Sequence, residues 1–370
     1  MASSDQRAAT AQRWRARWLA RRNRLLASPG FQRLAAAFPP TRPIARRRAA
    51  ELFDLLAGFV YAQTAHALVA SGLFDTLSEA PPTLSEAARA AGLPEEGALR
   101  LLKAAASLKL AERIGDRWML GTRGAALAGN PGARAMIVHH RLLYADLLDP
   151  LALLARRGGA TGLRRFWDYS GRGAGEAAPY SELMAATQPM VARQAIAAYR
   201  FGRHRRMLDV GGGAGSFVAA VAGAAPALRF GLFDLPPVLE LARERLAGLA
   251  SRVDFHAGDF RTDSLPPGHD LITLVRILHD HDDPEAAALL AGIRRALAPG
   301  GRLLIVEPMA GTPGAEAMGE AYFGFYLWAM GQGRPRTARE IGAMLEAAGF
   351  SSWRLLPTRQ PLIARVLLAS

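Results

Sequence analysis

The stretch that decides the fold is Met207-Leu-Asp-Val-Gly-Gly-Gly-Ala-Gly-Ser216, which runs directly into the apolar segment 217–221. This order predicts a short buried strand, a glycine-rich turn and a helix. Gly211 and Gly213 can adopt the backbone angles that such a turn needs, and they leave room for a ligand against the main chain. The following helix would point its free N–H groups at that ligand.

A second strand with an acid at its end follows. Phe230-Gly-Leu-Phe233 predicts the strand, and Asp234 stands where nucleotide-binding folds hold the hydroxyls of a ribose. Asp209, near the end of the first strand, would repel a pyrophosphate and attract a cationic amino-acid group. The two acids therefore favour S-adenosylmethionine over NAD as the ligand. The alternative is an ordinary strand–turn–helix that binds nothing.

Three further apolar segments, 252–260, 269–276 and 302–307, predict strands that also lead into polar residues. Strands that alternate with helices imply a doubly wound sheet, whose ligands lie beyond the carboxyl ends of the strands. Asp259 can accept a hydrogen bond from an adenine amino group, and Phe260 can pack on the face of the ring. The strand ends therefore predict one site at one edge of the sheet.

These motifs resemble those of class I S-adenosylmethionine-dependent O-methyltransferases, in the subfamily shared by plant caffeate-type enzymes and bacterial natural-product enzymes. The matching segments are Asp209-Val-Gly-Gly-Gly-Ala-Gly, Asp234-Leu-Pro, Gly258-Asp-Phe, Ile277-Leu-His-Asp-His-Asp-Asp and Ala298-Pro-Gly-Gly-Arg-Leu-Leu-Ile-Val-Glu307. The resemblance implies an α/β fold, with a Rossmann-like doubly wound methyltransferase domain at 201–370. An α-helical winged-helix dimerisation domain at 51–200 would precede it. The expected ligand is S-adenosylmethionine, without a metal, held by Asp209, Gly211, Gly213, Asp234, Leu235, Asp259, Phe260 and Arg276.

The same resemblance assigns the chemistry to His279 as general base and to Glu307 as the acid that orients it. His281 stands where the family usually has tryptophan, and Pro335 falls where a second glutamate is usual. A basic residue of the family is missing four positions before the base, and Arg276 beside that position is expected to substitute for it. The alternative for His279 is a histidine that only satisfies hydrogen bonds at a strand end.

Residues 83–120 carry the pattern of a winged helix-turn-helix. It consists of a capped helix over 83–92, a second helix over 94–108 and a two-strand wing over 109–120. Such a unit suits DNA binding or dimerisation. The second helix carries only Arg100 and Lys103 as bases beside two glutamates, which is little positive charge for a groove of phosphates. We therefore expect a homodimer that binds no nucleic acid, with a DNA-binding ligand sensor as the alternative.

Positive charge is concentrated at the N-terminus. Residues 1–50 contain 12 arginines and one aspartate, which supply +11 of the net charge of +14. Trp14, Trp18 and Leu25 fall on one helical face with arginines on the others, a pattern that suits the surface of an anionic membrane. The alternatives for this basic amphipathic arm are a partner subunit, nucleic acid and a solvated extension. Without a secretory signal or a sufficiently long apolar span, we expect a cytoplasmic protein, peripheral on the inner membrane.

Within the family, the arm and the segment after it are similar to the carotenoid O-methyltransferases of purple phototrophic bacteria. The similarity lies in Arg22-Asn-Arg-Leu-Leu-Ala-Ser-Pro-Gly-Phe-Gln-Arg33, Phe38-Pro-Pro-Thr-Arg-Pro-Ile-Ala-Arg-Arg-Arg48 and Phe53-Asp-Leu-Leu-Ala-Gly-Phe-Val-Tyr61. It implies methyl transfer to the tertiary hydroxyl of an acyclic hydroxycarotenoid; the alternative acceptor is a phenolic or polyketide natural product. An apolar pocket is expected from Phe166, Trp167, Tyr180, Met184, Tyr322, Phe325, Tyr326 and Met330, the last four at a helical spacing that also suits plain core.

Overall fold

The computed structural model describes residues 4–167 and 174–370. The chain divides into two compact units, Met1–Ala67 and Leu68–Ser370. Each unit is described by itself. The domain boundaries at residues 50 and 200 stay predictions.

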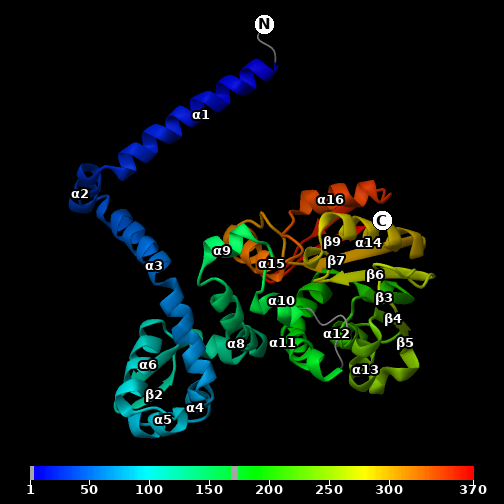
Figure 1. Ribbon diagram of the computed structural model, residues 1–370, viewed down its shortest axis with the longest axis horizontal. Coiled ribbons are helices and arrows are strands. Elements are labelled where there is room, and N and C mark those ends of the chain that lie inside the picture. The colour runs from blue at the N-terminus through cyan, green and yellow to red at the C-terminus, as the bar shows by residue number, and fades with distance from the viewer. Residues whose placement is uncertain (1–3, 168–173) are drawn as a thin grey trace. The chain divides into compact units, whose positions relative to one another are not determined.

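The N-terminal unit is built from α1 (Ser4–Ala27), α2 (Pro29–Ala37) and most of α3 (Arg42–Ala70) (Figure 1). α2 begins after Ser28, whose hydroxyl accepts from Phe31 N, and a proline occupies its first turn, where the missing N–H has no cost. On α1, Trp14 is 70% exposed and Trp18 is 51% exposed. The expected helix is therefore present, and both tryptophans are exposed on it. That this segment acts as an amphipathic arm stays a prediction.

α3 corrects one expectation from the sequence. Among the described residues it is a helix long and apolar enough, by length and composition alone, to cross a membrane, with 11% of its most apolar window buried. This helix was not predicted from the sequence, because Glu51 and Asp54 interrupt the apolar run. Exposed large side chains follow one another along it: Leu52, Phe53, Leu55, Leu56, Phe59 and Val60. Length and composition do not separate a membrane helix from one covered by another protein surface.

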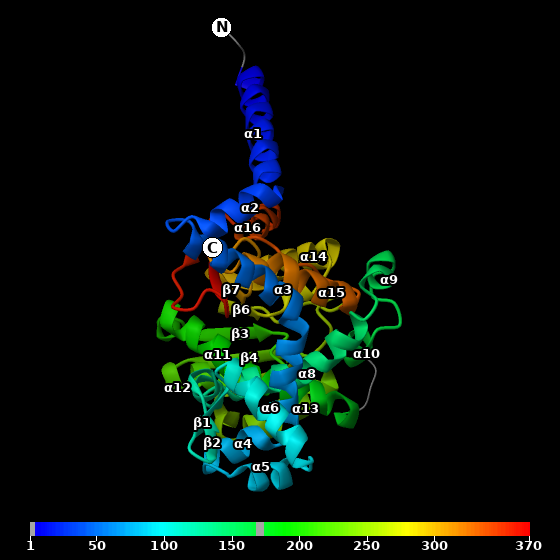
Figure 2. The ribbon, with the colours of Figure 1, turned by 90° about the vertical axis from the view of Figure 1, so that its left-hand side faces the viewer.

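The second unit opens with the predicted winged helix, made of α4 (Leu73–Glu79), α5 (Leu84–Ala91), α6 (Glu95–Ser107), β1 (Ala111–Ile114) and β2 (Arg117–Leu120) (Figure 2). Thr83 and Glu86 form a capping box at the start of α5, and Gly92 ends that helix at φ 63°. Gly115, at φ 62°, turns the chain between the antiparallel strands β1 and β2. Local capping and turn chemistry therefore explain why these elements were predictable.

In the described residues, five α-helices lie between the wing and the sheet. They are α7 (Thr122–Ala128), α8 (Pro131–Asp146), α9 (Pro150–Ala155), α10 (Gly162–Trp167) and α11 (Ala174–Ala198). α8 packs against both α10 and α11. Asp146, at the end of α8, accepts from Gly162 N and Leu163 N, and so holds the first turn of α10 against α8.

The predicted doubly wound sheet is confirmed. It has seven strands in the order β5-β4-β3-β6-β7-β9-β8. The first five in this order are parallel to one another, and β9 is antiparallel to β7 and to β8. The strands are β3 (Arg206–Val210), β4 (Arg229–Asp234), β5 (Val253–Ala257), β6 (His269–Val275), β7 (Leu297–Glu307), β8 (Trp353–Leu356) and β9 (Arg365–Ala369).

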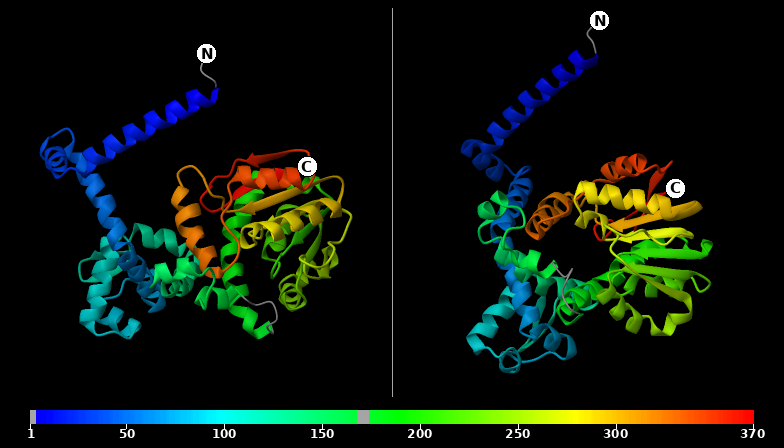
Figure 3. Two further views of the ribbon diagram at one scale, coloured as in Figure 1. Left: turned by 45° about the horizontal axis from the view of Figure 1, so that its top comes forward. Right: turned by 45° about the vertical axis from the view of Figure 1, so that its right-hand side comes forward.

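Helices cover both faces of this sheet (Figure 3). On one face α11, α12 (Ser216–Ala224) and α13 (Pro236–Arg245) pack with Met207, Phe230 and Leu304. On the other face α14 (Asp283–Ala296) and α16 (Ala338–Ala347) pack with Leu208, Ile272 and Leu303. Neighbouring residues of one strand thus enter opposite cores, as the two-residue period of a strand requires. The carboxyl ends of β3 to β7 remain available for a site.

Candidate functional site

The glycine-rich turn after β3 forms one wall of a cavity of about 120 Å³. Gly211, Gly213 and Gly215 have positive φ angles of 68°, 57° and 76°, a region that glycine enters without strain. A Cβ on Gly211 would lie 2.5 Å from the Ile277 side chain, so the turn is also closely packed. The cavity is lined by Trp167, Gly211, Gly213, Asp234, Leu235, Val238, Gly258, Asp259, Phe260, Arg261, Ile277, Asp280, His281, Met330 and Gln332.

Asp234, at the end of β4, holds this turn in place. Its Oδ2 accepts from Gly213 N at 2.7 Å, and its Oδ1 accepts from Leu235 N at 2.8 Å. Burial raises the pKa of Asp234 to about 6, although the two backbone donors pull it down. The carboxylate keeps free acceptor capacity toward the cavity, which is what a ribose needs.

Asp209 lies beneath the same turn and is only 1% exposed. Its Oδ1 accepts from the Thr273 hydroxyl at 2.6 Å, while its Oδ2 has no hydrogen-bond partner within residues 4–167 and 174–370. A Cβ on Gly212 would approach that oxygen to 2.9 Å. Burial raises the pKa of Asp209 to about 7, against the Thr273 hydrogen bond that lowers it. A buried, half-satisfied carboxylate fits a cation bound at the turn.

Arg276 links the end of β6 to α11. It adopts φ 58°, which costs a non-glycine residue roughly 1 kcal/mol. Its guanidinium donates to the Thr187 hydroxyl at 2.7 Å and to Gln188 Oε1 at 2.5 Å. Arg276 also lines a second cavity together with Met184 and the glycine turn. The structure thus brings the predicted Arg276 beside the turn, with its charge directed at α11.

Asp259 and Phe260 lie just after β5 and line the first cavity. The Asp259 carboxylate pairs with the Arg261 guanidinium at 2.6 Å, and hydrogen bonding to Arg261 keeps the pKa of Asp259 low despite partial burial. Phe260 meets the His281 ring edge to face, with centroids 5.1 Å apart. His281, where the related enzymes usually have tryptophan, therefore supplies an aromatic wall of the cavity.

The candidate base His279 is buried in a 3-10 turn, Leu278–Asp280, between two carboxylates. Its Nε2 lies 3.1 Å from Asp280 Oδ1, and its Nδ1 lies 3.5 Å from Glu307 Oε2. The second contact is an ion pair rather than a directed hydrogen bond, since Nδ1 meets no hydrogen-bond geometry within the described residues. Glu307 Oε2 also accepts from His279 N at 3.3 Å.

Burial alone would lower the pKa of His279, but Asp280, and then Glu307, outweigh burial and raise that pKa to about 10. Asp280 is a residue that the sequence reasoning missed. Its place directly after His279 was the only available signal, because the approach of its carboxylate depends on the shape of the turn.

Only some of the predicted acceptor-pocket residues line these cavities. Trp167 and Met330 line the first, and Met184 lines the second. Phe325 is partly buried in a neighbouring apolar cluster with Leu143 and Leu163. Tyr180 lies on α11, but its side chain is outside the part of the chain that the structure describes.

Tyr322 and Tyr326 belong to a polar layer that was not predicted. The Tyr326 hydroxyl lies 2.7 Å from His139 Nε2 and accepts from Trp167 Nε1 at 3.0 Å. The Tyr322 hydroxyl lies 2.8 Å from His140 Nε2, and Phe166 packs on the His139 ring at 4.6 Å. Burial lowers the pKa of His139 to about 4, so that imidazole is neutral. The layer joins α8 to the helical segment η4 (Met318–Phe323), which carries Tyr322, and to α15 (Gly324–Met330), which carries Tyr326.

Comparison with known proteins places the chain. Residues 147–351 match the family model for the O-methyltransferase domain. The chain belongs to the O-methyltransferase family. It is 43% identical to demethylspheroidene O-methyltransferase of Cereibacter sphaeroides, over 94% of this chain and 93% of that one. The protein of the same name from Rhodobacter capsulatus is 40% identical, over 92% of this chain and 85% of that one.

Solved structures agree with this assignment. The mitomycin 7-O-methyltransferase MmcR matches with a TM-score of 0.74 at 29% identity, over 88% of this chain and 99% of that one. CalO1, a methyltransferase in calicheamicin biosynthesis in its SAH-bound form, matches with a TM-score of 0.72 at 25% identity, over 87% and 98%. The expected fold and class of enzyme are thereby confirmed: this chain is an O-methyltransferase.

Proposed function

We propose that this enzyme transfers a methyl group from S-adenosylmethionine to the tertiary hydroxyl of an acyclic hydroxycarotenoid. The observation that carries the proposal is the 43% identity to a demethylspheroidene O-methyltransferase over nearly the whole of both chains. That match includes most of the N-terminal arm, which catalytic-domain similarity alone would not require. Relatives with other names, such as a mitomycin biosynthesis 6-O-methyltransferase and an acetylserotonin O-methyltransferase, are about 30% identical.

The donor site fits S-adenosylmethionine by its chemistry. Asp209, with an unpartnered buried oxygen within the described residues, would stabilise the cationic amino-acid end. Asp234 and Leu235 would hold the ribose, and Asp259 and Phe260 the adenine. Gly211 and Gly213 leave the main chain open to the ligand, and Arg276 adds positive charge beside the turn for a carboxylate. When bound, the donor supplies a methyl group that its sulfonium already activates for in-line transfer.

His279 would act as the base, positioned by Glu307. The tautomer with its proton on Nδ1, which lies 3.5 Å from Glu307 Oε2, would leave the Nε2 lone pair for the acceptor hydroxyl. A neutral Nε2 cannot donate to Asp280, so the acceptor replaces that carboxylate at Nε2. A tertiary alcohol has a pKa far above that of imidazole. The proton therefore moves to Nε2 while the carbon–oxygen bond forms and the sulfur–carbon bond breaks.

The test is transfer of radiolabelled methyl to a panel of acceptors in detergent, with hydroxylated acyclic carotenoids beside catechols and flavonoids. We expect label in the carotenoids only, and at least a hundredfold loss in His279→Ala with unchanged donor binding. Label in the phenols only would reject the carotenoid acceptor and keep the enzyme class. A His279→Ala variant at full rate would remove His279 as the base.

We also propose that the basic arm, residues 1–50, holds the protein at the cytoplasmic face of an anionic membrane, where an apolar carotenoid resides. Exposed Trp14 and Trp18, with arginines along the same helix, support this. Flotation with liposomes of zwitterionic and anionic lipid should show binding that deletion of residues 1–48 weakens. The matched control replaces both tryptophans by alanine and keeps every charge. Equal flotation of the full and shortened chains would reject the proposal.

For the winged helix, residues 83–120, we propose dimerisation rather than DNA binding. Its second helix, α6, begins with Glu95 and Glu96, which would face phosphates unfavourably. Sedimentation equilibrium should give a dimer mass independent of salt. A monomer that shifts duplex DNA at low salt, without methyl transfer to any lipid extract, would favour the DNA-binding ligand sensor instead.

A further inference from the structure

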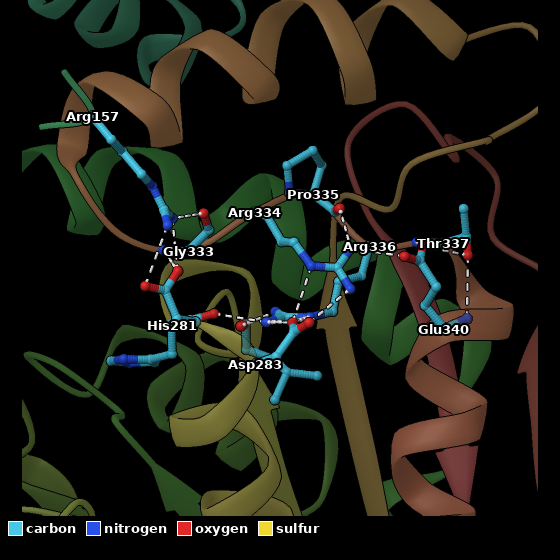
Figure 4. Close-up of polar contacts among 11 residues, drawn as sticks. Arg157, His281, Asp283, Gly333, Arg334, Pro335, Arg336, Thr337 and Glu340 are labelled. Carbon is cyan, nitrogen blue, oxygen red and sulfur yellow. Dashed lines mark hydrogen bonds and ion pairs between the residues drawn. The ribbon is translucent and has the colours of Figure 1, made fainter. Parts of the chain in front are cut away.

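A fully buried arginine lies beside the turn that carries the base. Arg336 is 0% exposed and is the largest fully buried side chain among the described residues. It belongs to the strap, defined here as residues 331–337, which joins α15 to α16. Its Nη1 donates to Leu278 O at 2.7 Å, and its Nη2 donates to His281 O at 2.8 Å. One planar guanidinium therefore bridges the carbonyls of Leu278 and His281, on either side of His279. Figure 4 shows the Arg336 side chain directed at His281 and Asp283.

Other residues of the strap also bind the turn that contains His279. Arg334 N donates to His279 O at 3.0 Å. Gly333, at φ 78°, packs so closely that a Cβ would lie 2.2 Å from His279 O, and its N–H donates to Asp282 Oδ1. The carbonyls of residues 278, 279 and 281 are thus all bound by strap donors. Such a set fixes the backbone, and the backbone sets the direction of the His279 ring.

Two carboxylates and one aromatic ring face the His279 side chain. Asp280 faces it from its own turn, Glu307 faces it from β7, and the apolar ring of Phe323 lies 5.7 Å away by centroids. Pro335 offers no acid from the strap. With one carboxylate on each nitrogen and an aromatic neighbour, rotation of the turn would move Nε2 away from an acceptor. Fixing the backbone of the turn therefore orients the His279 ring, a role that a second carboxylate from the strap would otherwise have.

We propose that Arg336 is a positioning residue that holds the backbone of the catalytic turn and thereby aims His279 at the acceptor hydroxyl. The inference rests on the proposed role of His279 as base. Arg336 does not line the donor cavity, to which the strap contributes Gln332. Its charge is balanced by Asp283, whose Oδ1 accepts from Nη2 at 2.7 Å and from Nε at 3.1 Å.

Arg334 supplies a matched control. Its side chain also pairs with Asp283 and, in addition, with Glu340, but only its backbone N–H reaches the turn. Arg334→Gln therefore removes similar ion pairs and leaves the turn carbonyls bound. Arg336→Gln removes the bridge and the charge, whereas Arg336→Lys keeps the charge and loses the planar fork.

Each variant is measured for kcat, acceptor KM, donor Kd and the pH profile of kcat. We expect Arg336→Gln to lower kcat about 100-fold, since a base misplaced by about 1 Å costs that much, with donor Kd within about twofold. Its profile should move to higher pH, because loss of a nearby cation raises the pKa of an imidazole. Arg336→Lys should lose kcat without that pH shift, and Arg334→Gln should stay within about threefold of the parent.

A folded Arg336→Gln enzyme with the kcat of Arg334→Gln would overturn the proposal. If Arg336→Gln does not fold, Arg336→Lys serves instead, because it keeps the charge beside Asp283 and loses the planar fork that bridges the two carbonyls. A folded Arg336→Lys enzyme with the kcat of the parent would overturn the proposal equally.

The His279→Gln background separates this inference from the function on which it rests. If His279→Gln retains the parent rate, the proposed base fails and Arg336 has nothing to aim. If His279→Gln is inactive while Arg336→Gln is fully active, only the positioning role fails. If His279 is the base and Arg336 positions it, adding Arg336→Gln to the His279→Gln enzyme should cause no further loss of kcat. This is the coupling expected of two residues that act as a unit.

Discussion

Substituting Asp209 by asparagine separates donor recognition from stability. In the unliganded chain the pKa of Asp209 is raised to about 7 by burial. A cationic ligand would favour the ionised form, so its apparent affinity should scale with the ionised fraction of Asp209. That fraction rises from roughly 3% at pH 5.5 to roughly 75% at pH 7.5, which predicts affinity about 25-fold tighter at the higher pH. The pKa of Asp234, raised to about 6, adds about fourfold over the same interval.

Calorimetric titration with S-adenosylhomocysteine at pH 5.5, 6.5 and 7.5 measures this slope. Adenosine is the matched ligand, because it has the ribose and base but no ammonium, and it should show only the fourfold change assigned to Asp234. Asp209→Asn should show the same small change with both ligands. The reasoning is refuted if the parent enzyme binds S-adenosylhomocysteine equally well at pH 5.5 and 7.5, or if Asp209→Asn keeps the steep slope.

The same substitution should stabilise the unliganded chain. Because the folded pKa of Asp209 lies above its unfolded value of 3.8, the folded chain binds more protons between about pH 4 and 7, and stability falls as pH rises through that window. At pH 7.5 the deficit is about 4 kcal/mol. Asp209→Asn keeps an acceptor for Thr273 and removes the charge. Urea unfolding should show it more stable by about 3 kcal/mol at pH 7.5 and nearly equal at pH 4; equal stability at both pH values would contradict the buried-charge argument.

Three shorter predictions concern the rest of the site. Glu307→Gln should lower kcat about 100-fold with little change in acceptor KM, because the imidazolium formed during transfer loses its carboxylate; steady-state rates at fixed pH measure this. Gly211→Ala should weaken donor binding at least tenfold, since the new Cβ would lie 2.5 Å from a side chain at a positive φ, whereas Gly223→Ala, in open space, should bind the donor normally in the same titration. Tyr326→Phe should destabilise the chain by about 1–3 kcal/mol in urea unfolding, because it leaves buried polar partners unsatisfied.

Much of the fold was predictable because its signals are local. The capping box at Thr83 and the turn at Gly115 each depend on a few adjacent residues. The strands were predictable because each is an apolar run that leads into an acidic residue. Parallel strands bring their carboxyl ends to the same edge of the sheet. Asp234, Asp259 and Phe260 therefore meet at one cavity, as predicted from their spacing. The roles assigned to them stay predictions.

The parts that sequence reasoning missed depend on contacts between distant segments. His139 and Tyr326 are 187 residues apart, and their hydrogen bond exists only because α8 packs beside α15. The sequence does not distinguish Arg336 from the many other arginines of the chain. Its hydrogen bond to Leu278 O depends on the path of the strap through space. The apolar character of α3 was missed for a different reason. Two charged residues interrupt its apolar run, and the sequence does not show how little of the helix is buried by the rest of the protein.

The electrostatics of the site link donor binding to the readiness of the base. In the unliganded chain the pKa of Asp209 is near 7 and the pKa of His279 is near 10, so at neutral pH the acid is largely protonated and the imidazole is charged. A positive ligand lowers the pKa of both groups, because it favours the carboxylate and disfavours the imidazolium. Donor binding therefore drives two proton losses in one direction, one that strengthens recognition and one that frees the Nε2 lone pair. Calorimetric heats of S-adenosylmethionine binding, measured in buffers of different ionisation enthalpy, count these protons. A count near zero at pH 7 would show that donor binding does not lower the two pKa values.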